Sequence, residues 1–241
     1  MAQILILLPA HDVDPTEVAF PWQVWREGGH SVVFATPDGA SAVTDPITLS
    51  GAGLPLLARG LRARPAARAA HAEMLASREW QAPHRWSDLK AADFVALHFP
   101  GGHGPGMRAY CDAADIARLA REAFAANQPV SAICHGVLPL ARAGVLAGRT
   151  TTSLTALMER SSILLTNRAL PGHYRTYPET VEAETRRALG PQGRYVTGPL
   201  LPGYAEATAP ETGFVVSDGL YLSGRWPGDA WTLALRLGEL L

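Results

Sequence analysis

The stretch PVSAICHGVLPLARAG, residues 129–144, decides the expected fold. It begins as an apolar run typical of a buried strand, passes through Cys134 and His135, and continues as a short helix that Gly144 ends. In open α/β sheets, ligands bind beyond the carboxyl ends of the strands, and the amides of a helix start favour a thiolate. The junction therefore suits a nucleophile, although most free cysteines are small buried apolar residues, which is how we interpret Cys111.

Short β-like runs alternate with longer amphipathic runs along the rest of the chain. This alternation predicts an α/β fold with a mostly parallel sheet and helices on both faces. The expected strands are 3–8, 31–39, 94–99, 150–154 and a hairpin in 214–225, and the expected helices are 16–29, 112–128, 155–167, 178–190 and 229–241. We expect one domain over 1–241, with an insertion around 47–81 where the alternation weakens and a helix starts near Pro65.

Composition and charge exclude several classes of protein. With 241 residues and 47% hydrophobic content, the chain can bury a sizeable core. The 21 basic and 22 acidic residues are dispersed, so we expect no nucleic-acid partner. No window reaches the roughly 18 apolar residues of a membrane span, and the first residues lack a signal-peptide pattern. We expect a cytoplasmic protein without a membrane partner, whose two cysteines stay reduced.

Three motifs and one acidic residue carry a family resemblance. The motifs are FPGGHGPGM (99–107), AICHG (132–136) and YLSGRWPGDA (221–230), and Glu17 lies just after the first strand. Together they resemble the ThiJ/PfpI superfamily of class I glutamine amidotransferase-like proteins, nearest to its intracellular protease/amidase and glyoxalase III–chaperone branches. The resemblance spans nearly the whole chain. It implies a flavodoxin-like sandwich with a nucleophile elbow and, because relatives are commonly dimers, a homodimer.

The resemblance also implies roles for individual residues. Cys134 is the nucleophile, and the backbone N–H groups of Gly102 and His135 form the oxyanion hole. Glu17 approaches the thiol as a protonated carboxyl group or a proton shuttle. We expect burial and the nearby thiolate to raise its pKa above that of a free Glu. His135 is the general base, and in relatives an acid orients it.

The acid that orients His135 is where the sequence departs from the pattern. The glyoxalase and chaperone branch has an aspartate at the position that Ala156 occupies here. Glu159, about one helical turn further on, either takes its place as a catalytic residue or faces solvent on an amphipathic helix. True glutamine amidotransferases carry a His-x-Glu pair late in the chain. No histidine follows His173, so we exclude that activity.

Other residues are candidates for substrate binding. His103 follows the double glycine and points either into the pocket mouth or to solvent. Tyr174 and Tyr177 either line the pocket or pack within their loop. The resemblance places Arg225 at the rim or at a subunit contact.

No metal or cofactor is implied by the motifs. No His, Cys, Asp and Glu group has zinc-site spacing. Some relatives in the chaperone branch bind a metal with two histidines and a carboxylate, but the sequence does not assign His71, Glu73 and His84 to such a site. The glycine-rich turn at 101–106 lacks the Walker lysine and the dinucleotide-binding spacing, so it fits a tight turn better than a phosphate site.

Two function classes remain. The first is a cofactor-independent cysteine enzyme acting on a small carbonyl or amide compound, as an amidase, another hydrolase, or a glutathione-independent glyoxalase or deglycase. The second is a non-enzymatic stress protein, a holdase chaperone or redox sensor that uses the same cysteine.

Overall fold

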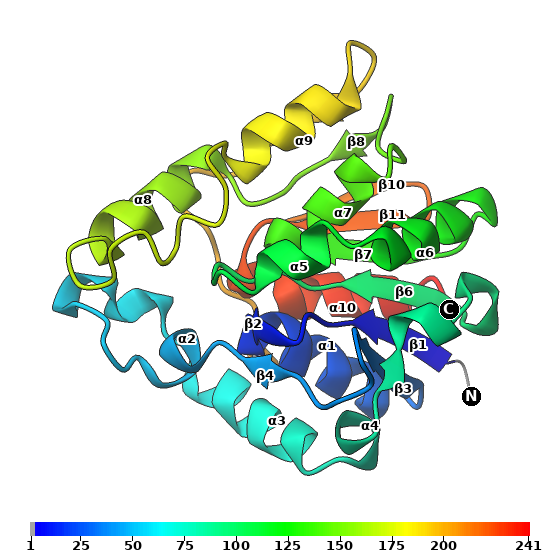
Figure 1. Ribbon diagram of the computed structural model, residues 1–241, viewed down its shortest axis with the longest axis horizontal. Coiled ribbons are helices and arrows are strands. Elements are labelled where there is room, and N and C mark those ends of the chain that lie inside the picture. Colours follow the sequence, from blue (N-terminus) through cyan, green and yellow to red (C-terminus); the bar gives the residue numbers. More distant parts are fainter. Residues whose placement is uncertain (1–2) are drawn as a thin grey trace.

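A seven-stranded sheet forms the centre of the computed structural model, which describes residues 3–241 (Figure 1). The strand order is β10-β11-β7-β6-β1-β3-β5, and every neighbouring pair is parallel except β10 and β11. The strands are β1 (Gln3–Leu7), β3 (Ser31–Thr36), β5 (His84–Arg85), β6 (Ala96–Phe99), β7 (Val130–Ile133), β10 (Val215–Asp218) and β11 (Tyr221–Gly224). The predicted mostly parallel sheet and its terminal hairpin are confirmed.

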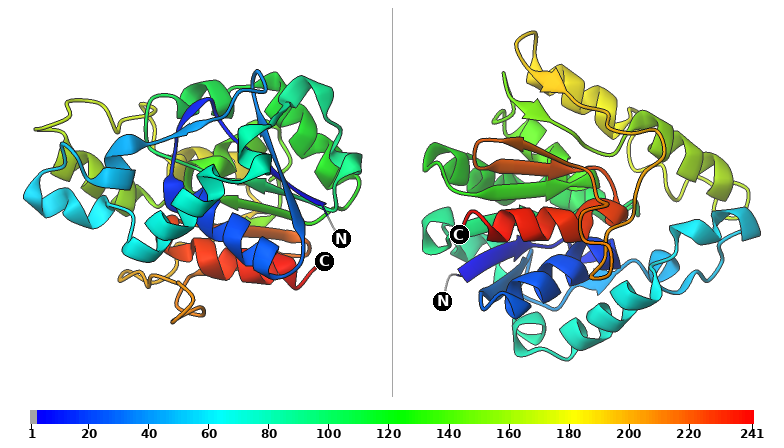
Figure 2. Two further views of the ribbon diagram at one scale, coloured as in Figure 1. Left: turned by 90° about the horizontal axis from the view of Figure 1, so that it is seen from below. Right: turned by 180° about the vertical axis from the view of Figure 1, so that it is seen from behind.

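Helices cover both faces of this sheet (Figure 2). On one face lie α1 (Pro15–Glu27) and α10 (Ala230–Gly238), with α3 (Pro65–Leu75) packed against α1. On the other lie α5 (Met107–Cys111), α6 (Ala114–Ala125) and α7 (Val137–Arg142). The two faces fill because the chain moves outward from β1 to β3 in one direction and from β6 to β7 in the other, and parallel connections of one hand then place their helices on opposite faces.

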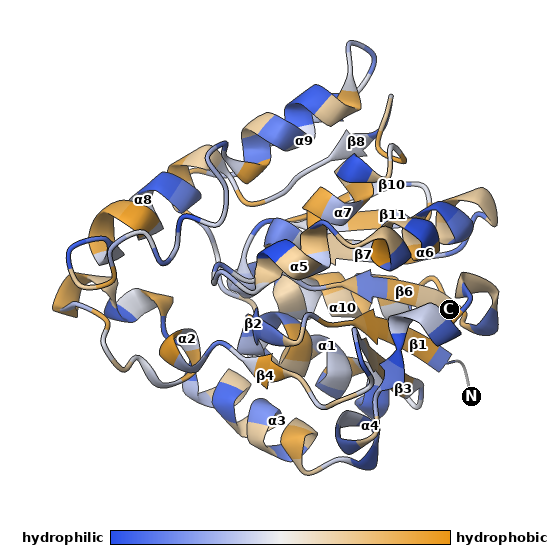
Figure 3. Cartoon of the chain, in the orientation of Figure 1, coloured by the Kyte–Doolittle hydropathy of each residue, from blue (hydrophilic) through white to orange (hydrophobic). Residues whose placement is uncertain are grey.

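The core follows from the apolar strands. Ile4, Leu5, Ile6 and Leu7 of β1 are fully buried, since helices cover both faces of this central strand. Figure 3 shows hydrophobic strands at the centre and a largely hydrophilic α9 (Val181–Leu189) at the periphery. Burying each such side chain contributes about 1.5–3 kcal/mol.

Further elements surround the sheet. α8 (Ala156–Thr166), α2 (Pro46–Ser50) and the 3₁₀ helix η1 (Leu56–Leu61) lie beyond the carboxyl ends of the strands (Figure 1). The remaining helices are short: α4 (Arg78–Gln81), η2 (Trp86–Asp88), η3 (Ala91–Asp93), η4 (Cys134–Gly136) and η5 (Pro227–Asp229). Two further sheets have two strands each. One pairs β2 (His11–Val13) with β4 (Val43–Thr44), and the other pairs β8 (Thr150–Thr151) with β9 (Arg194–Tyr195).

Two sequence expectations bear on these outer elements. The strand expected at 150–154 is only two residues long and pairs with β9, outside the main sheet. The segment 47–81 contains most of α2 together with η1, α3 and α4, and the expectation of one domain with an insertion there stays a prediction. No helix within residues 3–241 is both long enough and apolar enough to cross a membrane.

A proline inside α1 connects this helix to the sheet. Pro21 has no N–H, so the carbonyl of Glu17, four residues earlier, has no helical donor. His98 of β6 occupies the vacant acceptor, with Nε2 3.0 Å from the Glu17 carbonyl oxygen. Its Nδ1 lies 2.8 Å from Ser131 Oγ of β7, and burial lowers the pKa of His98 to about 4. A neutral imidazole thus fixes the start of α1 over β6 and β7.

We predict that His98→Leu lowers the free energy of unfolding by about 2–4 kcal/mol, because it removes two hydrogen bonds and strands a buried hydroxyl and a carbonyl. Urea denaturation followed by circular dichroism measures this. The exposed His84→Leu serves as the control and should change stability by less than about 0.5 kcal/mol. Equal effects of the two changes would contradict the connecting role of His98.

Candidate active site

Three segments meet at the carboxyl ends of adjacent strands. Glu17 lies in the first turn of α1, Gly101 follows β6, and Cys134 follows β7. The order of strands reverses between β6 and β1, which is where open α/β sheets leave a crevice for ligands. The site therefore occupies the position that the topology favours.

Cys134 adopts a backbone conformation that side-chain-bearing residues rarely adopt. Its φ is +58°, between the extended end of β7 and the start of η4. The turn fits closely against the end of β6, since a Cβ at Gly136 would overlap the carbonyl oxygen of Phe99. A strained turn that presents one side chain at a strand end is the geometry of the predicted nucleophile elbow.

The thiol lies at the wall of a cavity. Cys134 is 5% exposed, and the cavity has an empty volume of about 770 Å³. The walls come from the strand ends and from η1, α8 and the loops beyond them. The lining side chains include Asp14, Glu17, Asp45, Leu61, His103, Cys134, Met158, Ser162, Tyr174, Tyr204 and Trp226. Gly102, expected to contribute to the oxyanion hole, also lines this cavity.

Glu17 is fully buried beside the thiol. Its Oε2 accepts a hydrogen bond from the Gly101 N–H at 2.8 Å, and the Cys134 thiol also interacts with this carboxyl group. Burial, followed by the nearby Asp14 carboxylate, raises the pKa of Glu17 well above its usual value. This direction agrees with the sequence-based expectation, and it favours a protonated carboxyl group that can donate to sulfur.

The ionisation of Cys134 differs from the expectation. Burial raises the pKa of the Cys134 thiol well above its usual value, and negative charge on Glu17 raises it further. The His135 backbone N–H favours the thiolate but is outweighed. Desolvation of the sulfur therefore outweighs the stabilisation of the thiolate expected from the helix start. Both shifts favour a thiol beside a neutral Glu17.

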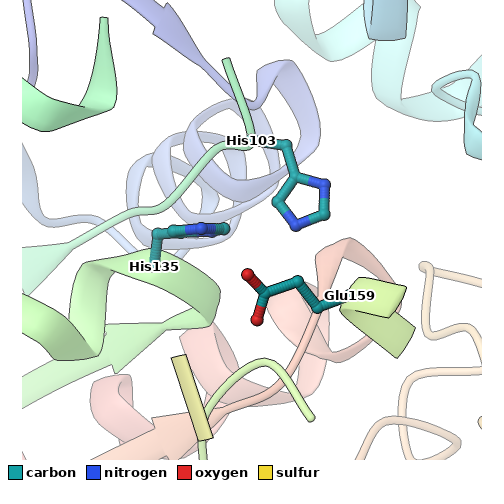
Figure 4. Close-up of side chains that lie close together, drawn as sticks. All are labelled: His103, His135 and Glu159. Carbon is teal, nitrogen blue, oxygen red and sulfur yellow. The ribbon is translucent and has the colours of Figure 1, made fainter. Parts of the chain in front are cut away.

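His135 and Glu159 lie on the other side of the sulfur. His135 is fully buried, with Nδ1 3.6 Å from Cys134 Sγ. Glu159, only 2% exposed, faces His135 from the first turn of α8 (Figure 4). Its Oε2 accepts from the Val181 N–H at 2.9 Å, and burial raises its pKa to about 7. Glu159 is therefore not the solvent-facing residue of the alternative interpretation.

The candidate substrate-binding residues divide into two groups. His103 and Tyr174 line the cavity, with His103 Nδ1 3.2 Å from Ser162 Oγ and the Tyr174 hydroxyl donating to Asp45 at 3.0 Å. Burial lowers the pKa of His103 to about 4. Tyr177 lies outside the cavity lining and packs on the guanidinium of Arg142, 4.3 Å from the ring centroid.

The resemblance placed Arg225 at the rim or at a subunit contact, but the structure buries its side chain away from the rim. Its side chain is fully buried, and Nε lies 3.0 Å from Oδ2 of Asp229, which is also fully buried. Nη1 donates to the Pro199 carbonyl at 3.1 Å. A buried guanidinium needs partners for its charge and its N–H donors. Its two partners here join the end of β11 to η5, through Asp229, and to the loop that contains Pro199. The next residue, Trp226, lines the cavity in its place.

Two buried acids of the cavity wall were missed from the sequence. Asp14 caps α1, accepting from the Thr16 and Glu17 N–H groups, and Asp45 caps α2. Burial raises the pKa of Asp14 to about 7 and also raises that of Asp45. Each acid directly precedes a proline at a helix start, an Asp-Pro signal that indicates a helix cap but not a cavity wall.

Comparison with known proteins identifies the family. Residues 8–199 match the family described as ThiJ/PfpI family-like, and the chain belongs to that family. An uncharacterized protein of Schizosaccharomyces pombe is 24% identical over 99% of this chain and 84% of its own length. The Deglycase PfpI of Pyrococcus furiosus is 35% identical over 31% of this chain and 43% of its own. The crystal structure of glyoxalase III from Candida albicans has a TM-score of 0.70 and 19% identity, over 98% of this chain and 95% of that one.

We predict that iodoacetamide alkylates Cys134 about ten-fold faster than Cys111, because Cys134 alone of the two lines the cavity. Cys111 is 3% exposed, its Sγ lies 3.6 Å from the His135 carbonyl oxygen, and burial raises its pKa strongly. Brief labelling followed by peptide mapping measures the ratio. Equal labelling of the two cysteines would show that the cavity does not set thiol access.

We predict that Glu17→Gln slows alkylation of Cys134 at neutral pH by about ten-fold and raises the apparent thiol pKa by about one unit. The reason is that an amide donates a weaker hydrogen bond to a thiolate than a carboxylic acid does. The measurement is the alkylation rate across pH, with the exposed Glu73→Gln as control. Superimposable wild-type and Glu17→Gln profiles would leave Glu17 with a purely structural role.

Proposed function

We propose that the chain is a cofactor-independent thiol enzyme acting on a small carbonyl compound, with a 2-oxoaldehyde such as methylglyoxal as its substrate class. The observation that carries the proposal is the position of the Cys134 thiol between the buried Glu17 carboxyl group and the His135 imidazole, at the wall of a cavity. The names of two similar proteins, a deglycase and a glyoxalase III, support this class of substrate.

The first step forms a carbon–sulfur bond. Cys134 Sγ adds to the aldehyde carbon while His135 Nδ1, 3.6 Å away, accepts the thiol proton. The carbonyl electron pair moves to oxygen, which accepts the proton of Glu17. The Gly102 and His135 N–H groups are the proposed donors to this oxygen as its charge develops. The product is a neutral hemithioacetal beside an imidazolium and a carboxylate.

The remaining steps move protons and use no external oxidant. The Glu17 carboxylate takes the proton from the hemithioacetal carbon, and the imidazolium of His135 protonates the neighbouring carbonyl oxygen, which gives an enediol. Glu17 then returns its proton to the second carbon, and His135 takes the hydroxyl proton from the first. The result is a lactoyl thioester. Water hydrolyses the thioester to lactic acid and restores the Cys134 thiol, and transfer of the imidazolium proton from His135 to the Glu17 carboxylate restores both groups.

Glu159 fits this scheme as a positioning residue. An orienting acid keeps an imidazole in the tautomer and direction needed for proton transfer. Glu159 faces His135 from α8, and its Val181 hydrogen bond fixes its orientation. A hydrogen bond from His135 Nε2 to Glu159, which is not formed in this structure, would form as the imidazole accepts the thiol proton. It takes the place of the aspartate that the related branch carries at the position of Ala156. An amide substrate would use the same residues through an acyl-enzyme that water hydrolyses.

We predict that the purified protein converts methylglyoxal to lactate without glutathione, and that Cys134→Ala lowers kcat/KM by at least about 1,000-fold, because no other thiol reaches the cavity. The measurement is lactate formation over time. Cys111→Ser should stay within about two-fold of the wild type. Equal rates for Cys134→Ala and the wild type would contradict the proposal.

A second candidate, a holdase or a redox sensor using the same cysteine, is favoured by one observation. Several leucines are highly exposed: Leu56, Leu57, Leu164, Leu200 and Leu201. Exposed apolar side chains of this kind can bind unfolded chains. Stoichiometric oxidation of Cys134 by peroxide, with no turnover of any carbonyl, would favour this candidate over the enzyme. The homodimer and the cytoplasmic location stay predictions.

A further inference from the structure

Three side chains converge beside the thiol without hydrogen-bonding to one another. His103 follows β6, His135 belongs to η4 and Glu159 to α8, and Figure 4 shows them facing one another. Each offers one ligand atom, and these atoms lie within 4.8 Å of one another. In the part of the chain that the structure describes, this is the one group of three or more His, Cys, Asp or Glu side chains so placed.

The free nitrogen atoms of this group have no partner. Nε2 of His103 and Nε2 of His135 are both buried and have no hydrogen bond within the described residues. Buried polar atoms are nearly always paired, so two unpaired imidazole nitrogens next to a carboxyl group indicate an occupant that the protein itself does not supply. Because His135 is fully buried and points at this space, the feature is more than a cluster of titratable residues.

The opposite atoms of two of these side chains are held in place. His103 Nδ1 lies 3.2 Å from Ser162 Oγ, and Glu159 Oε2 accepts from the Val181 N–H at 2.9 Å. Metal-binding histidines and carboxylates usually have such supporting hydrogen bonds, which fix the tautomer and aim the free lone pair. In His135, Nδ1 lies 3.6 Å from Cys134 Sγ, so Nε2 is again the nitrogen that is available to a metal ion.

We propose that His103, His135 and Glu159 bind one divalent transition-metal ion, with zinc as the reference ion, through Nε2 of each imidazole and a carboxylate oxygen. Two imidazoles and one carboxylate suit zinc and cobalt, and three protein ligands leave one position for water. In a tetrahedral zinc site, neighbouring ligand atoms are roughly 3.4 Å apart, given bonds of about 2.0–2.1 Å. The three ligand atoms lie within 4.8 Å of one another in the structure. Small side-chain rotations would bring them to the spacing of a zinc site.

The ion would also fix the proton on His135. A neutral imidazole carries one proton, and metal on Nε2 leaves that proton on Nδ1, which faces Cys134 Sγ. Metal binding and acceptance of the thiol proton at Nδ1 then exclude each other. The binding proposal itself does not depend on the proposed carbonyl chemistry, because it concerns an equilibrium that can be measured without substrate.

The test is direct titration of the chelator-treated full-length protein. Zn²⁺ is followed by calorimetry, and Co²⁺ by its visible absorption, which is intense for four-coordinate sites. We expect one equivalent of either ion to bind the wild type. His103→Gln and Glu159→Gln should each weaken binding by at least ten-fold, and Ser162→Ala by several-fold through the lost support of His103.

Matched variants separate this site from the alternatives. Exposed His84→Gln and Glu73→Gln should leave the affinity unchanged, and so should Cys134→Ser, which keeps all three ligands but abolishes thiol chemistry. Absence of binding to the wild type would overturn the proposal and leave a bridging water as the occupant. Binding lost in Cys134→Ser but kept in His103→Gln would also overturn it, because the thiol would then be the ligand. If His103→Gln is unfolded by circular dichroism, Glu159→Gln decides.

Discussion

The hydrogen bond from the Gly101 N–H to the Glu17 carboxyl group holds the site together. It joins the first turn of α1 to the turn after β6, directly beside the elbow after β7 that presents Cys134. A second connection lies beneath it, where His98 donates to the carbonyl of the same Glu17 and contacts Ser131 in β7. Glu17 is thereby fixed through its backbone to β6 and through its side chain to the turn after β6. Pro21 makes the backbone contact available, because it leaves the Glu17 carbonyl without a helical donor.

Desolvation dominates the chemistry of this arrangement. It raises the pKa of both Glu17 and Cys134, so neither group readily carries charge. Two acids that each resist ionisation and interact with each other titrate as a pair. In the proposed reaction, the proton therefore leaves sulfur as the bond to the substrate forms, and no exposed thiolate is needed beforehand. Burial lowers the pKa of His135, which favours the neutral imidazole that the proposed reaction uses as its proton acceptor.

The sequence predicted much of the fold and the centre of the site, because both depend on local patterns. Apolar runs such as residues 3–8 and 129–133 identify buried strands, and a cysteine directly after such a run identifies the elbow. The burial of Glu159 and the position of Arg225 could not be predicted, since each depends on a partner distant in sequence or on a loop that covers it. Glu159 is buried through its contact with Val181, and Arg225 through Asp229 and the Pro199 carbonyl. Desolvation of the thiol likewise follows from tertiary packing rather than from a motif.

The protonation of Glu17 is the central claim, and infrared difference spectroscopy tests it most directly. The carboxyl carbonyl stretch of a protonated acid is separate from that of a carboxylate, and subtracting the Glu17→Gln spectrum isolates this residue from Asp14 and Glu159, which burial also affects. The account predicts a protonated-acid band at neutral pH in the wild type that is missing in Glu17→Gln. A difference spectrum that contains only carboxylate bands would contradict it, because an ionised Glu17 could not donate a proton to sulfur or to the substrate oxygen.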